Sequence, residues 1–166
     1  MKSLIIGFSR AKSLLEIGSI IIAAADKEPY SHCYIRINDA STGLDMIYQA
    51  SKGYVNCLTY NNFCTANLPV KEYQMAISDS MYINTLTLLQ NNLGVKYGFM
   101  QLVAMGIKLV FGVKINFKFT DNEYICSQFA GVIAKYEGIK MPDDLKFQAP
   151  SDIDRLLAAS NVSRVL

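Results

Sequence analysis

One cysteine of this chain stands where the start of a helix would favour the thiolate form. The apolar residues that follow it recur at the spacing of one helix face, and they are Phe129, Val132, Ile133 and Tyr136. Cys126 lies three residues before Phe129, so it shares this face at the start of the predicted helix, which Gly138 should end. A helix dipole and unpaired backbone N–H groups stabilise a thiolate at such a position. The alternative is that Cys126 is a small buried side chain, as most free cysteines are.

A cysteine nucleophile needs a base and a group that orients the base. His32 is the only histidine in the chain, so it is the only imidazole available. Gln49 could accept a hydrogen bond from Nδ1–H of His32 and so turn Nε2 toward the sulfur. Taken singly, His32 is better explained as a core histidine and Gln49 as an ordinary polar residue at a strand edge. Together with Cys126 they make a candidate Cys–His–polar set.

The strands that must hold His32 and Gln49 form a predicted hairpin. Apolar and polar residues alternate over 30–37, turn residues cluster over 38–43, and 44–51 follows as the next strand. If Ile37 pairs with Leu44, then His32 lies directly opposite Gln49, at about 5 Å between Cβ atoms. A shift of one residue would put the two side chains on opposite faces of the sheet.

The remaining elements predict an α+β domain. Residues 1–13 show no strong period, and the further strand candidates are 17–25, 54–59, 70–77 and, weakly, 113–119. The helix candidates are a segment capped by Ser78 or Ser80 and ended by Gly94, then 99–110, the Cys126 helix, and 153–159 with Ser151 as cap. Strands precede helices, which favours a single domain over 1–166 with an antiparallel sheet.

Composition excludes several classes of function. Apolar residues make up 51% of the chain and charged residues 18%, which is typical of a globular protein. The net charge is only +2 and no cluster of lysine and arginine exists, so we expect no nucleic-acid partner. The four cysteines, Cys33, Cys57, Cys64 and Cys126, form no Cys-x-x-Cys pair. With one histidine, this predicts no metal or cofactor, and free thiols in a reducing, cytoplasmic setting.

Two apolar stretches could suggest a membrane segment. Residues 17–25 end in Ala-Ala-Ala-Asp like a signal peptide, but charged residues precede them closely and the run is short for a spanning helix. Residues 97–113 are interrupted by Gln101 and Lys108. We therefore expect a buried core helix in the second stretch, and peripheral membrane contact is left open but not expected.

Seven short motifs follow one another along nearly the whole chain. They are Gly7-Phe8-Ser9, Ile17-Gly18-Ser19-Ile20-Ile21, Tyr30-Ser31-His32-Cys33-Tyr34-Ile35, Ile47-Tyr48-Gln49-Ala50, Tyr97-Gly98-Phe99, Tyr124-Ile125-Cys126-Ser127-Gln128-Phe129 and Ala149-Pro150-Ser151-Asp152-Ile153. In this order they resemble the motifs of permuted NlpC-type papain-fold cysteine hydrolases, in particular the YiiX-like branch, with lecithin–retinol acyltransferase proteins as relatives. The resemblance implies a circularly permuted papain-like fold, in which an antiparallel β-sheet or barrel packs against helices. It is compatible with a bacterial or phage protein.

The resemblance also implies roles for individual residues. Cys126 would be the nucleophile, His32 the general base, and position 49 the third polar residue. Family members often carry Glu or His at that position, whereas this chain has Gln, which can orient an imidazole but cannot neutralise an imidazolium. By analogy with papain-like sites, the backbone N–H of Cys126 is a candidate oxyanion donor.

Three functions follow from these observations. The leading one is a thiol hydrolase that cleaves an amide or peptide bond through an acyl-enzyme on Cys126. The second is a thioesterase or acyltransferase acting on lipid-like acyl groups, which the apolar composition and the 99–110 segment favour. The third is a binding or inhibitory protein on the same fold that has lost turnover, which the neutral Gln49 favours. In all three, Cys33 is expected to be buried and unreactive, and Cys57 and Cys64 to be structural or incidental.

Overall fold

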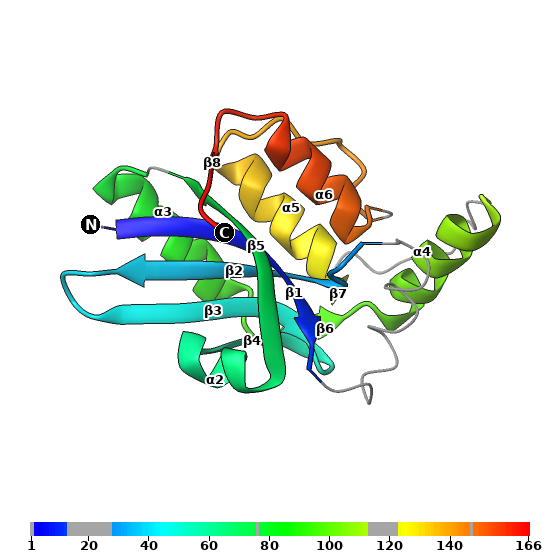
Figure 1. Ribbon diagram of the computed structural model, residues 1–166, viewed down its shortest axis with the longest axis horizontal. Coiled ribbons are helices and arrows are strands. Elements are labelled where there is room, and N and C mark those ends of the chain that lie inside the picture. Colours follow the sequence, from blue (N-terminus) through cyan, green and yellow to red (C-terminus); the bar gives the residue numbers. More distant parts are fainter. Residues whose placement is uncertain (1, 13–27, 76, 113–122, 147) are drawn as a thin grey trace.

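The structure is a computed structural model that describes residues 2–12, 28–75, 77–112, 123–146 and 148–166. In this part of the chain, one curled sheet of eight strands packs against helices, which confirms the α+β prediction (Figure 1). The strands are β1 (Lys2–Ala11), β2 (His32–Asp39), β3 (Leu44–Ser51), β4 (Tyr54–Thr59), β5 (Asn67–Met75), β6 (Lys96–Tyr97), β7 (Glu123–Tyr124) and β8 (Ser163–Arg164). The helices are α2 (Tyr60–Ala66), α3 (Asp79–Asn91), α4 (Phe99–Phe111), α5 (Cys126–Tyr136) and α6 (Pro150–Ala158).

The sheet is mixed rather than purely antiparallel. Its strand order is β7-β6-β4-β3-β2-β1-β5-β8. Every ladder over the described residues is antiparallel except the short one between β6 and β7, which is parallel. The predicted antiparallel sheet is therefore right for the seven strands from β6 to β8 in this order and wrong only for β7 at the other edge.

Four strands were not predicted from the sequence: the short β6, β7 and β8, and the long β1, which lies near the middle of the sheet. Strand β1 pairs with β2 on one side and with β5 on the other. Residues 4–9 are buried without interruption, because side chains on both faces of β1 are covered. A strand covered on both faces has no alternation of apolar and polar residues, so the period of 2 that marks half-buried strands is absent here.

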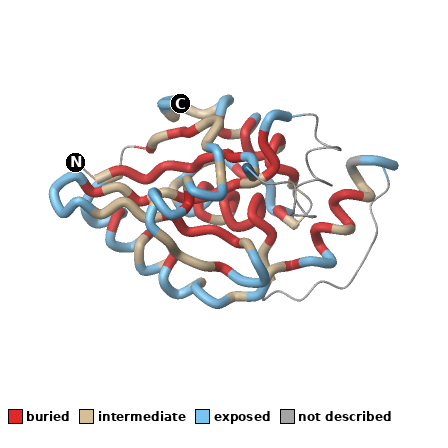
Figure 2. The backbone as a smooth tube through the Cα atoms, turned by 60° about the horizontal axis from the view of Figure 1, so that its bottom comes forward, coloured by how far each residue is buried: buried red, intermediate tan, exposed pale blue. Residues whose placement is uncertain are grey.

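The two faces of the sheet are covered by different helices. Cys33 and Ile35 of β2 belong to the main core, together with Phe129 of α5. Tyr34 of β2 points the opposite way and packs against Phe63 of α2 in a smaller cluster. The buried strands run through the middle of the molecule, with exposed turns around them (Figure 2). Helix α2, which the sequence analysis missed, thus covers the face that carries His32 and Tyr34.

The predicted helices are found near their expected positions, but some of their first residues and caps differ. Ser78 caps α3, and its Oγ accepts a hydrogen bond from the N–H of Met81 at 3.2 Å. Not every apolar residue of this segment is buried, since Met81 and Leu93 are 38% and 43% exposed. Helix α6 begins at Pro150, earlier than the expected 153, which puts Ser151 inside the helix rather than at its cap. The strands predicted for 17–25 and 113–119 lie outside the described residues.

Candidate active site

Cys126 is the first residue of α5, as the sequence predicts. The first hydrogen bond of the helix runs from the N–H of Phe129 to the carbonyl of Ile125, at 3.0 Å. The N–H groups of residues 126–128 therefore have no acceptor within the helix. Helix α5 packs against β2 and β3, which leaves Cys126 only 2% exposed. The thiol thus lies at the positive end of a helix dipole and close to the sheet.

The surroundings of Cys126 stabilise its thiolate. The pKa of the thiol lies well below its ordinary value, first because the Cys33 thiol donates a hydrogen bond to the sulfur. Burial opposes this by raising the pKa. A hydrogen bond from His32, the charge of the imidazolium, and the backbone N–H of Cys33 lower it further. A thiolate that persists toward lower pH is the form in which cysteine is a nucleophile.

His32 contacts both of the other predicted residues. It is the first residue of β2, so its ring lies at the end of the strand that faces the start of α5. Its Nε2 lies 2.7 Å from Oε1 of Gln49. Because the amide oxygen can only accept, Nε2 must carry the hydrogen, and Nδ1 is the nitrogen left for the sulfur of Cys126. The sequence predicts the reverse, with Nδ1 bound to Gln49 and Nε2 facing the sulfur, and that detail is wrong.

The predicted register between the two strands is also wrong, by two residues. Leu44 pairs with Asp39 rather than with Ile37, because the turn has four residues instead of six. A shift of two residues keeps every side chain on its face of the sheet, because side chains alternate with a period of 2. Gln49 is consequently a diagonal neighbour of His32 and not the residue directly opposite, and its long side chain still reaches the ring.

A polar pocket of about 380 Å³ opens beside His32 and Gln49, between β3, β4 and α2. Its wall carries hydroxyl, amide and ammonium groups from Ser51, Lys52, Asn56, Asn62, Thr65 and Asn67. No Asp or Glu occurs among the described residues that line it. Such a pocket suits a ligand with carbonyl and N–H groups better than a purely aliphatic chain.

Two residues of the site were missed by sequence reasoning. Cys33 was correctly expected to be buried, but it was given no role, whereas it hydrogen-bonds the sulfur of Cys126. No pattern in the sequence places these two thiols together, because they come from a strand and a distant helix. Asn56 hydrogen-bonds Gln49 from β4, and here a signal existed. The two predicted strands are separated by Lys52 and Gly53 alone, and a two-residue turn puts Asn56 opposite Gln49.

The other two cysteines are not part of the set. All four cysteines are free, as expected. Burial raises the pKa of the Cys57 thiol, against the opposing hydrogen bond from Tyr48. Cys64 packs beside Phe63 in the cluster under α2. Burial thus disfavours the thiolate of Cys57, and Cys64 belongs to the cluster around Phe63 rather than to the core that holds Cys126.

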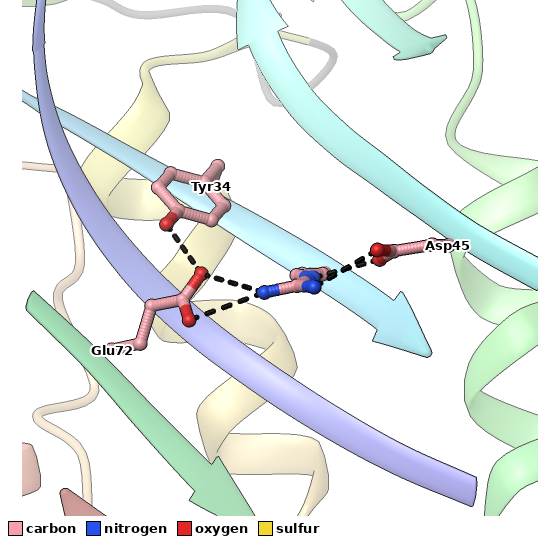
Figure 3. Close-up of polar contacts among 4 residues, drawn as sticks. Tyr34, Asp45 and Glu72 are labelled. Carbon is pink, nitrogen blue, oxygen red and sulfur yellow. Dashed lines mark hydrogen bonds and ion pairs between the residues drawn. The ribbon is translucent and has the colours of Figure 1, made fainter. Parts of the chain in front are cut away.

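A second polar cluster lies next to the site, and it is held together by ion pairs rather than by neutral amides. Arg36 binds Asp45 with two hydrogen bonds of 2.7 and 2.9 Å, and its third nitrogen lies 3.3 Å from both oxygens of Glu72 (Figure 3). The hydroxyl of Tyr34 donates to Glu72 at 2.7 Å. The ring of Tyr60 in α2 covers the guanidinium at 3.6 Å. Each charge here is paired, which is the arrangement of a structural network.

Neither metal sites nor membrane helices are found where the structure describes the chain. No group of three or more His, Cys, Asp or Glu side chains within the described ranges could hold a metal ion. No described helix is long and apolar enough to cross a membrane.

Comparison with models of known protein families finds no match, and a search of curated proteins finds none either.

Proposed function

We propose that this protein is a cysteine hydrolase that cleaves an amide or peptide bond on a circularly permuted papain-like fold. The observation that carries the proposal is the Cys126 thiol at the start of α5, hydrogen-bonded to His32, with Gln49 on the far nitrogen of the ring. Strands that carry the histidine and the third polar residue precede the cysteine helix in the chain, which supports the permuted order.

Each residue of the set has a defined step. The Cys126 thiolate attacks the substrate carbonyl carbon, and a C–S bond forms while negative charge moves to the carbonyl oxygen. The N–H groups at the start of α5 are candidates to stabilise that oxygen. The His32 imidazolium then gives its proton to the leaving nitrogen as the C–N bond breaks. Water attacks the resulting thioester, His32 takes its proton, and the acid and the free thiol are released.

The pocket beside His32, which is lined by His32 and Gln49 but not by Cys126, is the observation that favours one substrate class. Its amide, hydroxyl and lysine groups support a peptide or another amide-bearing substrate. The four free cysteines support a reducing, cytoplasmic setting.

A thioesterase or acyltransferase is the second candidate, and α4 is the observation that favours it. Phe99, Met100, Val110 and Phe111 of this helix are 60%, 48%, 62% and 72% exposed. Exposed apolar side chains on one helix are a feature of proteins that handle acyl chains or touch a lipid surface. The chemistry on Cys126 would be the same, with an ester or thioester as substrate and an acyl chain near α4.

The proposal is tested by the reactivity of the thiols and by turnover. Iodoacetamide labelling followed by peptide mass mapping gives a rate for each cysteine. We expect Cys126 to label faster than Cys57 and Cys64 at pH 6, where an ordinary thiol is almost wholly protonated. Fluorogenic peptide amides and p-nitrophenyl esters of increasing chain length then separate the two enzymes, with Cys126→Ser as the inactive control.

The outcomes separate the three functions. Turnover of amides that is lost in Cys126→Ser supports the hydrolase, whereas turnover of long-chain esters alone supports the acyl-handling enzyme. Fast labelling without turnover of either class supports a binding protein on the same fold. If Cys126 labels no faster than Cys57 or Cys64, both enzyme proposals fail.

A further inference from the structure

Asn56 on β4 connects the turn of the β3–β4 hairpin to the candidate site. It lies directly opposite Gln49 in the ladder, and Nε2 of Gln49 donates to Oδ1 of Asn56 at 3.3 Å. Nδ2 of Asn56 donates in turn to the backbone oxygens of Ser51 at 3.0 Å and Tyr54 at 3.3 Å. A continuous series of hydrogen bonds therefore runs from two backbone carbonyls, through two amide side chains, to the ring of His32.

The backbone carbonyls determine the direction of every hydrogen bond in this series. A carbonyl can only accept, so Asn56 must turn its nitrogen to the backbone and its oxygen to Gln49. Gln49 must then offer its nitrogen to Asn56 and its oxygen to His32. That oxygen also only accepts, so Nε2 of His32 must carry a hydrogen. Reversing either amide would bring two donors or two acceptors face to face.

We infer that Asn56 is a positioning residue that acts through Gln49 to hold the neutral His32 ring in its Nε2–H tautomer, with Nδ1 left for Cys126. For its catalytic meaning the inference rests on the proposed function. It also explains why an amide suits position 49. A glutamate there would have no hydrogen to offer Oδ1 of Asn56, and two acceptors would then meet at the 3.3 Å contact.

The tautomer can be read directly, because the chain contains one histidine. In ¹⁵N-histidine-labelled Cys126→Ala protein at alkaline pH, the ring is neutral and has no thiolate partner, so its two nitrogen shifts report the tautomer ratio. We expect Nε2–H to dominate. Asn56→Ala should lower the ratio of Nε2–H to Nδ1–H by about three- to tenfold, the range that one net hydrogen bond supplies. Asn62→Ala removes an exposed amide from the same pocket and should leave the ratio unchanged.

Two further variants separate orientation of Gln49 from support of the turn. Asn56→Asp keeps an acceptor for Gln49 but loses the donor to the carbonyls of Ser51 and Tyr54. We expect it to keep the tautomer ratio although the hairpin is weakened. Asn56→Ala in a Gln49→Ala background should change the ratio no further, because the contact through which it acts is already gone.

Three results would overturn the inference. These are an unchanged ratio in Asn56→Ala, an equal effect of Asn56→Ala with and without Gln49, or a lost Nε2–H preference in Asn56→Asp. The last one decides the matter if Asn56→Ala does not fold. The ratio is measured without the sulfur of Cys126, so the result does not depend on turnover. An unchanged ratio beside a fast-labelling Cys126 overturns this inference alone, and a changed ratio beside a slow-labelling Cys126 overturns the enzyme alone.

Discussion

Two rows of polar side chains cross the same face of the sheet in opposite directions, and both begin on β2. One runs from His32 through Gln49 on β3 to Asn56 on β4. The other runs from Tyr34 on β2 across β1 to Glu72 on β5. Phe63 of α2 lies against both starting residues, with ring centroids 4.6 Å from Tyr34 and 6.4 Å from His32. The two rows thus share a strand, a face and a covering helix.

The rows differ in charge and in what their hydrogen bonds decide. Glu72 in the second row pairs with Arg36 of β2, which also binds Asp45 of β3, and these residues with Tyr34 form the charged row. Removing one of the three ions would leave a buried charge without its partner. The row of amides carries no charge, and its members decide the orientation of a ring rather than the balance of charge. We therefore expect the charged row to contribute mainly to stability and the amide row mainly to reactivity at Cys126.

Arg36→Leu should have the largest effect. Glu72 has only 7% of its side chain exposed and would lose its cation, so we expect a loss of about 3–5 kcal/mol in the free energy of unfolding. Urea denaturation measures it. Lys135→Ala breaks the exposed ion pair with Asp143 and serves as the control, with a much smaller loss because solvent screens that pair. Equal losses in the two variants would contradict a structural role for the charged row.

Gly7→Ala should disrupt the same row by crowding. Gly7 pairs with Tyr34 on one side and with Glu72 on the other, and the Tyr34 side chain crosses over it to reach the carboxylate. An added Cβ would lie 2.1 Å from Cζ of Tyr34. We expect a loss of about 1–3 kcal/mol in the free energy of unfolding. Gly43→Ala is a poor control because of its positive φ, so Ser3→Ala on the same face of β1 is preferable. A Gly7→Ala protein as stable as the wild type would contradict the crossing.

Gln49→Ala should affect reactivity more than stability. We expect turnover to fall by about ten- to a hundredfold, which corresponds to about 1.4–2.7 kcal/mol in the barrier. The reason is that the ring of His32 loses the acceptor on Nε2. The measurement is the pH profile of kcat/KM on the amide or ester that proves active, beside a urea titration. A fall in stability without a fall in turnover would place Gln49 with the charged row instead.

Cys33→Ala should have the smallest effect, which is confined to the pKa of the Cys126 thiol. The pKa of Cys126 is lowered first by the hydrogen bond from Cys33, so removing that thiol should raise it. The inflection of the iodoacetamide rate against pH should therefore move to higher pH, and the rate below the inflection should fall. Cys57→Ala and Cys64→Ala should leave the inflection in place. An inflection that does not move in Cys33→Ala would show that Cys33 only fills space.

Sequence alone determined the parts of this protein whose pattern is local. β3 and β4 have the predicted bounds, the cap at Ser78 is as expected, and α5 begins at Cys126. Each of these carries a repeating apolar period or a capping residue that needs no knowledge of distant partners. The grouping of His32 and Gln49 survived a wrong register because an error of two residues leaves each side chain on its face.

Tertiary structure decided what depends on residues far apart in the chain. β1 showed no alternation because the sheet and its helices cover both of its faces. Cys33 joined the site because α5 places Cys126 against the start of β2. The choice between the two nitrogens of His32 depends on a series of donors and acceptors that ends at backbone carbonyls in another hairpin. Periodicity shows which face a side chain occupies, but the direction of a hydrogen bond depends on its partners, and only folding brings them together.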